Sequence, residues 1–406
     1  MSYKILRITN LYSEYIESYY SKNKQYLTQN YQEQYEHLTN DSIELVSSYS
    51  KFFRLLNVDA IDLITNASPL QQTWAKENNV PFDLPFEKFI IEQIKFFKPD
   101  ILWIDDTRLL NKFWINEMKS KVSSLKLLVG HICAPFNSVI EESLSCFDIM
   151  FTCATCTQEK FEKMGILSYC IYHSFDHTIL EKVSKFENPF PQEKLVFTGS
   201  LYTGFGLHKS RIEYIEEMLS KNIDITIYGN LESKLKVRQK QSFYYILNTL
   251  KALGLDSVID KTTILKKFEK YGDEKIKYYS SNLLASVKPP VFGVEMLQLL
   301  SNSNLCFNIH GEIAKKCAGN VRLFEATGVG SCLVTDWKDN MSDIFNLEEE
   351  VVTYKSLDEC IDKMSWLMNN PNEAKKIALA GQKRTLKDHT VENRVSQIHS
   401  LFLKHL

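Results

Sequence analysis

The sequence has no long apolar run and no excess of charge of either sign. Its 406 residues include 48 Lys and Arg and 50 Asp and Glu, so the formal net charge is −2. A balanced charge disfavours a dedicated nucleic-acid-binding protein. No run approaches the roughly 18 apolar residues that indicate a membrane span, and residues 1–10 (MSYKILRITN) show no apolar core of a secretory signal. These absences predict a cytoplasmic protein, possible contact with the inner face of the membrane being left open.

One basic cluster stands out from the balanced background, at residues 234–240 (KLKVRQK). Such a cluster is typical of a solvated helix face. The alternative is a patch that faces anionic lipid or a phosphate-bearing acceptor.

The cysteines are odd in number, nine in all. Four lie in apolar, strand-like runs and are expected to be small core residues, as suits a reducing compartment: Cys133, Cys170, Cys306 and Cys332. Cys153 and Cys156 form an isolated CxxC pair. A zinc site would need a second ligand pair, and none follows at a suitable spacing. The sequence therefore predicts no metal site.

Short apolar runs alternate with longer helical patterns along the whole chain. Strands are expected at 4–9, 61–65, 101–104, 125–131, 149–152, 169–173, 195–198, 223–228, 305–309, 331–335 and 351–354. Helical patterns lie between them, for example at 70–77, 86–97 and 158–164, and dominate 232–283 and 357–406. This alternation predicts α/β architecture with parallel sheets, and the length suits two doubly wound domains.

The rhythm breaks at residues 176–193, which end in FENPFPQE. Two prolines and weak periodicity predict an interdomain linker here. The predicted division is residues 1–175, the linker 176–193, a second domain 194–385 and a C-terminal helix 386–406.

The segment 320–336 (NVRLFEATGVGSCLVTD) predicts a helix, a glycine-marked turn and a strand ending at Thr335 and Asp336. Arg322 and Glu325 are three residues apart and lie on neighbouring positions of one helix face. A carboxylate can accept hydrogen bonds from both ribose hydroxyls, and an arginine can grip a diphosphate with two prongs. The alternative is an ordinary intrahelical ion pair.

A second candidate phosphate site is the strand–loop–helix segment 198–211 (TGSLYTGFGLHKSR). Backbone N–H groups at a helix start favour anions. Residues expected to contribute are Gly199, Ser200, His208, Lys209 and Arg211. The GxG at 204–206 is not a full dinucleotide fingerprint, and no Walker pattern is present. The alternative is a flexible interdomain loop.

Segment 320–336 resembles the C-terminal signature of bacterial glycosyltransferases related to the spore-maturation protein CgeB, a group within the GT-B, glycosyltransferase-family-1-like set. The similarity continues through 339–345 (DNMSDIF) and 351–395, which contains NPNEA and AGQKR, and upstream through 288–313. The N-terminal half is similar more loosely, through ILRITNLYSEYIESYY and FKPDILWID.

The resemblance implies a GT-B fold: two Rossmann-like domains facing a central cleft, with the C-terminal helix packing back on the N-terminal domain. It implies a nucleotide-sugar donor in the C-terminal domain and an acceptor site in the N-terminal domain. Glu325 would hold the ribose, Arg322 the phosphate, and Asn320 would frame the pocket. The sugar side would be lined by Asn308 and His310 at the end of one strand, and Thr335 and Asp336 at the end of another are further candidates for donor binding.

The implied reaction is transfer of a sugar to a glycan, lipid-linked or protein acceptor, in polysaccharide or glycoconjugate synthesis, with no metal or other cofactor required. An inverting enzyme needs a base for the acceptor hydroxyl, and the candidates after first-domain strands are Glu14, Asp105 and His131. Asp105 is alternatively a helix cap, and His131 a structural residue or a sugar contact. The adjacent Asp105 and Asp106 suggest a further alternative, the acidic pair with which GT-A enzymes hold a metal ion.

The sequence departs from the retaining pattern of two glutamates eight places apart, because Cys317 stands where the first would lie and Glu312 is thirteen places before Glu325. Stereochemistry therefore stays open. Two rival functions are a GT-B-fold sugar-nucleotide epimerase and a non-catalytic binding or partner module.

Overall fold

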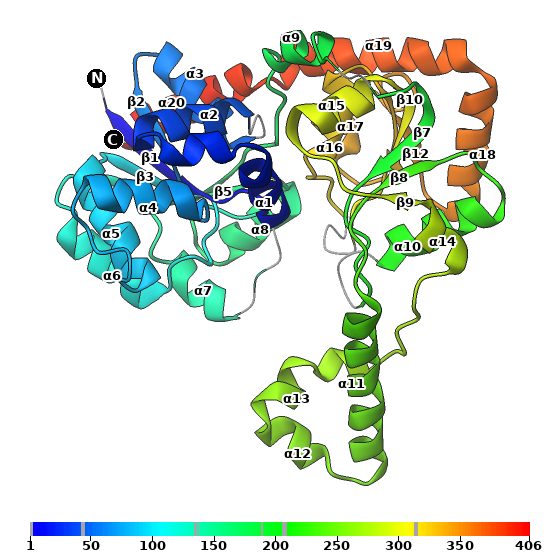
Figure 1. The fold of residues 1–406 in the computed structure, drawn as a ribbon, viewed down its shortest axis with the longest axis horizontal. Coiled ribbons are helices and arrows are strands. Elements are labelled where there is room, and N and C mark those ends of the chain that lie inside the picture. The colour runs from blue at the N-terminus through cyan, green and yellow to red at the C-terminus, as the bar shows by residue number, and fades with distance from the viewer. Residues whose placement is uncertain are drawn as a thin grey trace.

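The chain forms two α/β halves side by side, and a helical arm extends from the second (Figure 1). This computed structural model describes residues 3–41, 45–133, 136, 138–187, 190–204, 209–311 and 316–406. Each half is built around a six-stranded sheet in which every pairing is parallel. The predicted fold class is confirmed.

The first sheet has the order β2-β1-β3-β4-β5-β6. Its strands are β1 (Lys4–Thr9), β2 (Asp59–Ile64), β3 (Ile101–Ile104), β4 (Leu127–His131), β5 (Ile149–Thr152) and β6 (Ser168–Cys170). Side chains alternate between two buried layers along β1: Leu6 and Ile8 pack in one cluster and Ile5 in the other. Helices on both faces bury nearly the whole of β1, β3, β4 and β5, which explains the continuous apolar runs in the sequence, whereas β6 at the edge is half-buried.

The second sheet has the order β12-β11-β10-β7-β8-β9. Its strands are β7 (Glu193–Thr198), β8 (Thr226–Tyr228), β9 (Val287–Lys288), β10 (Ser303–Asn308), β11 (Cys332–Asp336) and β12 (Val352–Tyr354). The order runs outward in both directions from β7 and β10, the arrangement of a doubly wound sheet. All the predicted strands occur, within a few residues at their ends. The two-residue β9 was not predicted, because so short a strand has no pattern.

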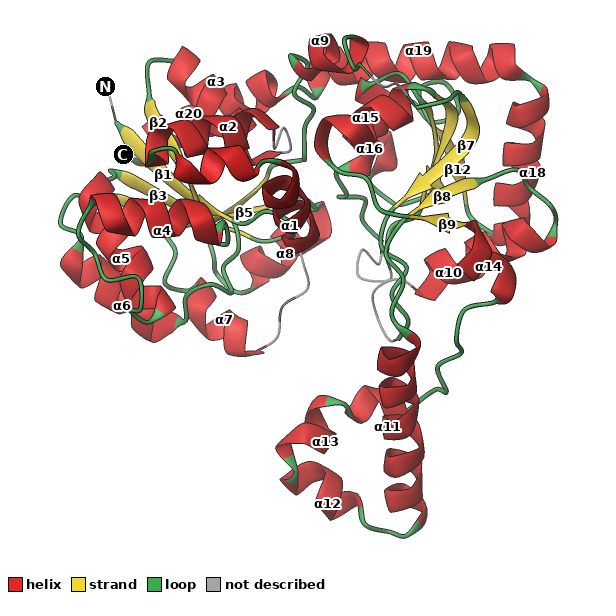
Figure 2. Cartoon of the chain, viewed as in Figure 1, coloured by secondary structure: helices red, strands yellow, loops and turns green. Residues whose placement is uncertain are grey.

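Helices cover both faces of each sheet (Figure 2). Those of the first half are α1 (Ser13–Lys22), η1 (Lys24–Thr28), α2 (Tyr31–Asp41), α3 (Leu45–Leu55), α4 (Ser68–Glu77), α5 (Phe86–Phe97), α6 (Lys112–Lys121), α7 (Ser138–Leu144) and α8 (Thr155–Lys163). Between the halves lies α9 (Ile179–Ser184). Those that follow are α10 (Lys209–Ser220), α11 (Lys234–Ala252), α12 (Asp256–Lys261), α13 (Thr263–Lys267), η2 (Glu269–Gly272), α14 (Ser281–Ser286), α15 (Gly293–Ser301), α16 (Arg322–Gly328), α17 (Met341–Ile344), α18 (Leu357–Asn369), α19 (Pro371–Asp388) and α20 (Val391–His405).

The C-terminal helix α20 belongs to the core of the first half. Val391, Val395, Ile398 and Phe402 pack with residues of α3 and of the first sheet. Thr390 caps this helix through a reciprocal capping box with Asn393. The predicted return of the C-terminal helix to the first domain is therefore confirmed, whereas the predicted domain boundaries stay predictions.

The chain crosses between the halves twice, and the two crossings are hydrogen-bonded to each other. The Phe175 N–H donates to the His389 carbonyl at 2.9 Å, and the Val391 N–H donates to the Phe175 carbonyl at 3.1 Å. The Phe175 ring fills the space beside Gly328, where an added Cβ would lie 2.4 Å from it. Glycine at position 328 therefore leaves the space that the Phe175 ring occupies, and a larger residue there would clash with the ring.

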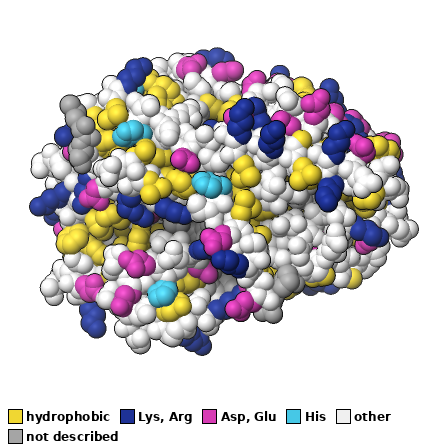
Figure 3. Space-filling model, turned by 90° about the horizontal axis from the view of Figure 1, so that it is seen from above, with side chains coloured by type: hydrophobic (Ala, Val, Ile, Leu, Met, Phe, Trp, Pro, Cys, Tyr) yellow, Lys and Arg dark blue, Asp and Glu magenta, His cyan; other side chains and the backbone are white. Residues whose placement is uncertain are grey.

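The arm consists of α11, α12, α13 and η2, which project away from the second half (Figure 1). The helices of the arm pack on one another. Elsewhere the surface mixes acidic and basic side chains, as the view from above shows (Figure 3). In the described part of the chain, no helix has the length and apolar character needed to cross a membrane.

We predict that Phe402→Ala will destabilise the protein. Phe402 is fully buried and packs against Phe53, Phe151 and Trp103, so its removal should cost about 3–5 kcal/mol of unfolding free energy. The neighbouring change Leu403→Ala is the control, because Leu403 is 46 % exposed. Urea denaturation of both variants is the measurement. Equal midpoints would contradict the role given to α20.

Candidate functional site

Polar residues gather at the carboxyl ends of β7, β10 and β11, the edge where doubly wound sheets bind ligands. Thr198 ends β7, Asn308 ends β10, and Thr335 and Asp336 end β11. This edge faces the first half, because Cys317, in the loop before α16, contacts Thr155 of α8 at 3.6 Å. The predicted donor residues therefore lie on the side of the second half that meets the first.

Arg322 and Glu325 form an ion pair in the first turn of α16. Arg322 Nη1 lies 2.8 Å from Glu325 Oε2, and the side chains are only 15 % and 8 % exposed. Arg322 Nη1 also contacts the Met296 sulfur at 3.0 Å. The intrahelical pair offered as the alternative therefore exists, but it is buried at the interdomain edge. Solvent screens buried charges only weakly, so each of the two charges can still attract a polar group of a ligand.

A hydrogen-bonded network surrounds this pair. Asn320 Nδ2 donates to Asn308 Oδ1 at 2.9 Å, and Asn308 Nδ2 donates to Thr335 Oγ1 at 2.8 Å. His310 Nδ1 lies 2.7 Å from Asp336 Oδ1. Burial would raise the pKa of Asp336, but hydrogen bonds from His310 lower it below the usual value. The structure thus brings the residues predicted on these two strand ends into direct contact.

Several buried polar atoms of this region have no hydrogen-bond partner among the described residues. They are Thr198 Oγ1, His310 Nε2, Asn320 Oδ1 and Glu325 Oε2, the last making only the ion-pair contact with Arg322. Buried polar atoms are normally satisfied, because an unpaired one costs about 1–3 kcal/mol. Unmet groups grouped around one sheet edge are typical of a site that a polar ligand completes.

The loop after β7 contributes backbone as well as side chains. The Gly199 N–H donates to the Tyr228 carbonyl at 3.0 Å. Arg211 Nε donates to the Ile309 carbonyl at 3.2 Å, and its Nη1 to the Ser200 carbonyl at 3.5 Å. Arg211 therefore joins this loop to the end of β10. The predicted residue His208 and Gly206 of the GxG lie outside the described residues.

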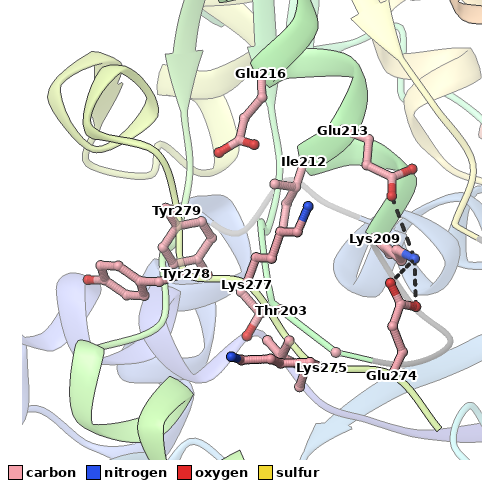
Figure 4. Close-up of a pocket in the computed structure, with 12 residues that line it drawn as sticks. Thr203, Lys209, Ile212, Glu213, Glu216, Glu274, Lys275, Lys277, Tyr278 and Tyr279 are labelled. Carbon is pink, nitrogen blue, oxygen red and sulfur yellow. Dashed lines mark hydrogen bonds and ion pairs between the residues drawn. The ribbon is translucent and has the colours of Figure 1, made fainter. Parts of the chain in front are cut away.

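Lys209 points elsewhere. Its Nζ contacts both carboxylate oxygens of Glu274, at 2.7 and 2.8 Å, and lies 3.6 Å from Glu213 (Figure 4). These residues line a pocket of about 190 Å³ between α10 and the segment that returns from the arm. The charge of Lys209 is therefore balanced by carboxylates, which weakens the prediction that it binds phosphate.

In the first half, the structure brings two of the three predicted acceptor-side residues together. His131 Nδ1 lies 3.3 Å from Asp105 Oδ1. Glu14 is exposed on α1 and instead accepts a 3.4 Å hydrogen bond from Tyr202 of the second half. His131 and Asp105 form one unit, and Glu14 bridges the halves.

Asp105 is held by a buried arginine. Arg7 Nη2 lies 2.5 Å from Asp105 and its Nη1 lies 3.5 Å from Asp62. Burial would raise the pKa of Asp105, but Arg7 and His131 lower it to about 2, whereas burial raises the pKa of Asp62 to about 7. A group so acidic is a poor base, so His131 is the better candidate of the pair.

Asp106 does not act with Asp105. Its carboxylate accepts two hydrogen bonds of 2.7 Å from Arg108, whereas Asp105 pairs with Arg7. The two carboxylates are thus committed to different cations. This arrangement disfavours the acidic-pair hypothesis.

The cysteines depart furthest from expectation. Cys306 and Cys332 are buried as predicted, but Cys133 is exposed and Cys170 half-buried. Cys133, Cys153 and His173 bring their Sγ and ring nitrogen atoms within 4.8 Å of one another, a group that could hold a metal ion. The pKa of the Cys153 thiol is well below its usual value because of a hydrogen bond with Cys133.

The CxxC pair is divided between two partners. Cys153 joins Cys133 and His173, whereas Cys156 forms a disulfide with Cys317 of the second half, the Cα atoms being 6.2 Å apart. Neither association has a sequence spacing that reveals it. The sequence holds a weaker signal: Cys133 and Cys153 follow predicted strands and His173 ends one, so all three are expected near one sheet edge.

A larger pocket, which sequence reasoning missed, lies between the halves. Its volume is about 490 Å³, and it is bounded by α1, α9 and the start of α15. Tyr15, Tyr19 and Lys22 line it from the first half, and Phe292 and Glu295 from the second. No motif marks it, because its residues are scattered over the chain.

Comparison with protein families finds a match in the second half of the chain. Residues 214–400, 187 of the 406, match the model of a family described as "Glycosyl transferase-like". This stretch holds the whole Arg322–Glu325 network. The chain thus carries a glycosyltransferase-like domain; a resemblance to the CgeB group in particular stays a prediction.

Solved structures share the fold over the full chain. Anabaena Alr3699/HepE in complex with UDP-glucose has a TM-score of 0.59 at 12 % identity, covering 99 % of this chain and 100 % of that one. A glycosyltransferase from Rickettsia africae has a TM-score of 0.55 at 11 % identity, covering 100 % and 98 %. Sucrose-phosphate synthase from Thermosynechococcus elongatus has a TM-score of 0.55 at 10 % identity, covering 99 % of this chain and 98 % of that one. The search of curated proteins finds no match. At such identities the likeness shows the fold, which is GT-B.

We predict that Arg7→Met will destabilise the first half. The change leaves Asp62 and Asp105 buried without their cation, and breaking such a buried pair costs about 3–5 kcal/mol. The control is Arg108→Met, whose side chain is 57 % exposed beside Asp106; it should cost less than about 1 kcal/mol. Urea unfolding at neutral pH compares them. A loss as small for Arg7 as for Arg108 would refute the structural role of this cation.

Proposed function

We propose that the protein is a glycosyltransferase that moves a sugar from a nucleotide-sugar donor, bound by the second half, to an acceptor bound by the first. The observation that carries the proposal is the set of unmet buried polar atoms at the carboxyl edge of the second sheet, on Thr198, His310, Asn320 and Glu325. A ribose and a sugar offer many hydroxyl groups, which can supply the missing partners. The glycosyltransferase-like match over 214–400 supports the same site.

The geometry supports a role for each of these residues. Glu325 Oε2 has unused accepting capacity for ribose hydroxyls. Arg322 beside it supplies positive charge to a diphosphate. Asn308, Asn320, Thr335 and the His310–Asp336 pair form the wall of the sugar side. Arg211 holds the loop after β7 against this wall.

The proposed reaction needs no added metal ion, because cationic side chains can stabilise charge on the leaving diphosphate. On the acceptor side, His131 oriented by Asp105 is the preferred candidate for receiving the hydroxyl proton. The identity of the acceptor is proposed only by class: a glycan, a lipid-linked sugar or a protein, in polysaccharide or glycoconjugate synthesis.

The donor can be identified by a thermal-shift screen with UDP-, GDP-, dTDP- and CMP-sugars. A ligand that binds only the native state raises the melting temperature by mass action. UDP-glucose is the first to test, because Alr3699/HepE was crystallised with it. Product analysis then separates the functions. Transfer to an added glycan supports the proposal, conversion of the sugar nucleotide without acceptor supports an epimerase, and binding without turnover supports a partner module.

We predict that Glu325→Ala will weaken nucleotide binding roughly 10- to 100-fold, because hydrogen bonds to a charged group contribute about 1.5–3 kcal/mol. Calorimetric titration with the nucleotide found in the screen measures the change. Glu349→Ala is the matched control, because Glu349 is an exposed carboxylate of the same half. Equal affinity for both variants would place the nucleotide elsewhere.

A further inference from the structure

The first sheet places two thiols and an imidazole at one edge. Cys133 follows β4, Cys153 follows β5 and His173 follows β6, and these are neighbouring strands. Their Sγ and ring nitrogen atoms all lie within 4.8 Å of one another. Zinc–sulfur bonds of about 2.3 Å and zinc–nitrogen bonds of about 2.0 Å place tetrahedral ligand atoms roughly 3.5–4 Å apart. A small contraction would therefore close the group around one ion.

We propose that Cys133, Cys153 and His173 bind a divalent ion of the zinc type. Two thiolates and an imidazole select such an ion over magnesium or calcium, which require oxygen ligands. The group also has a neighbouring imidazole: His131 Nε2 lies 3.2 Å from Cys133 Sγ, so metal binding at Cys133 and proton acceptance by His131 would compete for this ring nitrogen. Outer hydrogen bonds of this kind orient metal ligands.

The position of the site gives the ion a structural role. Cys153 packs against Gly319 of the second half, where an added Cβ would lie 2.9 Å from the Cys153 carbonyl oxygen and 3.2 Å from its Sγ. An ion here ties three strand ends of the first sheet beside the loop that precedes α16. This inference does not depend on the proposed transfer reaction.

Cobalt titration of the full chain, kept reduced with a phosphine, tests the site. Co²⁺ alone is the probe, because tetrahedral thiolate coordination produces strong near-ultraviolet and visible bands. We expect one equivalent to bind with these bands, and zinc to displace it. Cys153→Ser and His173→Ala should each weaken binding about 100-fold or more, since each removes a ligand. Cys170→Ser is the control, because Cys170 on β6 is outside the group.

Circular dichroism confirms that each variant is folded, and Cys133→Ser provides a second ligand variant on the exposed side of the group. Absence of the thiolate bands in the folded wild type would overturn the proposal. So would bands that persist in Cys153→Ser or disappear only in Cys156→Ser, because the ion would then lie on other cysteines.

A second and independent observation concerns the arm. Residues 234–272, which form the arm, contain 9 Lys and Arg but only 3 Asp and Glu, a net charge of +6, in a chain whose formal net charge is −2. The rest of the chain therefore carries −8. Two of these cations, Lys236 and Lys240, face Glu232 at the base of the arm. The basic segment is also the part that projects from the body (Figure 1).

The arm also exposes apolar side chains. Leu235 and Ile246 of α11, and Leu253 directly after it, are 68 %, 46 % and 67 % exposed. Spacings of 11 and 7 residues place them on one face of the helix, opposite the buried Val237 and Leu247. Leu255, Val258 and Ile264 are exposed on the neighbouring helices. Aliphatic side chains beside lysines are typical of surfaces that insert into the interface of an anionic bilayer.

We propose that the arm docks the protein on a membrane surface that contains anionic lipid. Positive charge attracts the lipid headgroups, and the exposed aliphatic groups enter the boundary with the acyl chains. Nucleic acid would match the charge alone and would leave Leu235, Ile246 and Leu253 unburied. The combination therefore favours a bilayer.

Co-sedimentation of the full chain with vesicles tests this docking. Vesicles of phosphatidylcholine and phosphatidylglycerol should bind the protein, and vesicles of phosphatidylcholine alone should not. Reversal of three arm cations, with Lys234→Glu, Arg238→Glu and Lys251→Glu, should weaken binding roughly 100-fold. The matched control reverses three exposed lysines of the first half: Lys76, Lys88 and Lys112.

A second variant removes only apolar groups, with Leu235→Ser, Ile246→Ser and Leu253→Ser, and should also lose vesicle binding. Equal binding to both vesicle types, or equal loss in the control, would overturn the proposal. The alternative partner of the arm is a second copy of the chain, and analytical ultracentrifugation tests it. If the wild type forms a dimer that the apolar variant cannot form, and neither binds vesicles, the arm is a contact between copies of the chain.

Discussion

The pairing of the two chain crossings fixes how the halves of this protein are joined. Phe175 exchanges backbone hydrogen bonds with His389 and Val391, so the outgoing and returning segments form one short parallel bridge. The ring of Phe175 packs beside Gly328 at the end of α16. The helix that carries Arg322 and Glu325 is therefore anchored directly to the crossing point. Any rotation of one half relative to the other must act on α16.

Much of the fold could be predicted from the sequence, and for a clear reason. Strands covered on both faces are continuously apolar, as at Ile101–Ile104, and a parallel connection needs a helix. The bounds of short elements were harder to predict from the sequence. The segment 176–193 was predicted as a linker from its prolines, yet it contains α9, whose Ile179 and Val183 pack into the core beside α16. A six-residue helix held by tertiary contacts has too short a pattern to reveal itself.

The arrangement of candidate site residues was predictable where contacts are local, as in the ion pair of Arg322 and Glu325. It was not predictable where residues meet only in three dimensions. Arg7 lies in a predicted strand, and no local pattern shows that it is buried between Asp62 and Asp105 or that it lowers the pKa of Asp105. The same limit applied to Cys133 and His173, which are 40 residues apart and meet because β4, β5 and β6 are neighbours. Sheet order, rather than spacing, produces such clusters.

The packing of α20 has a consequence for the order of folding during synthesis. The second sheet and its covering helices are complete once α19 has left the ribosome, because all their residues precede 389. The first half, although synthesised earlier, lacks one covering helix until 391–405 emerge. Domains usually fold from the N-terminus as they are made. Here the first half keeps an apolar face of its sheet open until α20 has been synthesised, so the half that is synthesised first is the last to close.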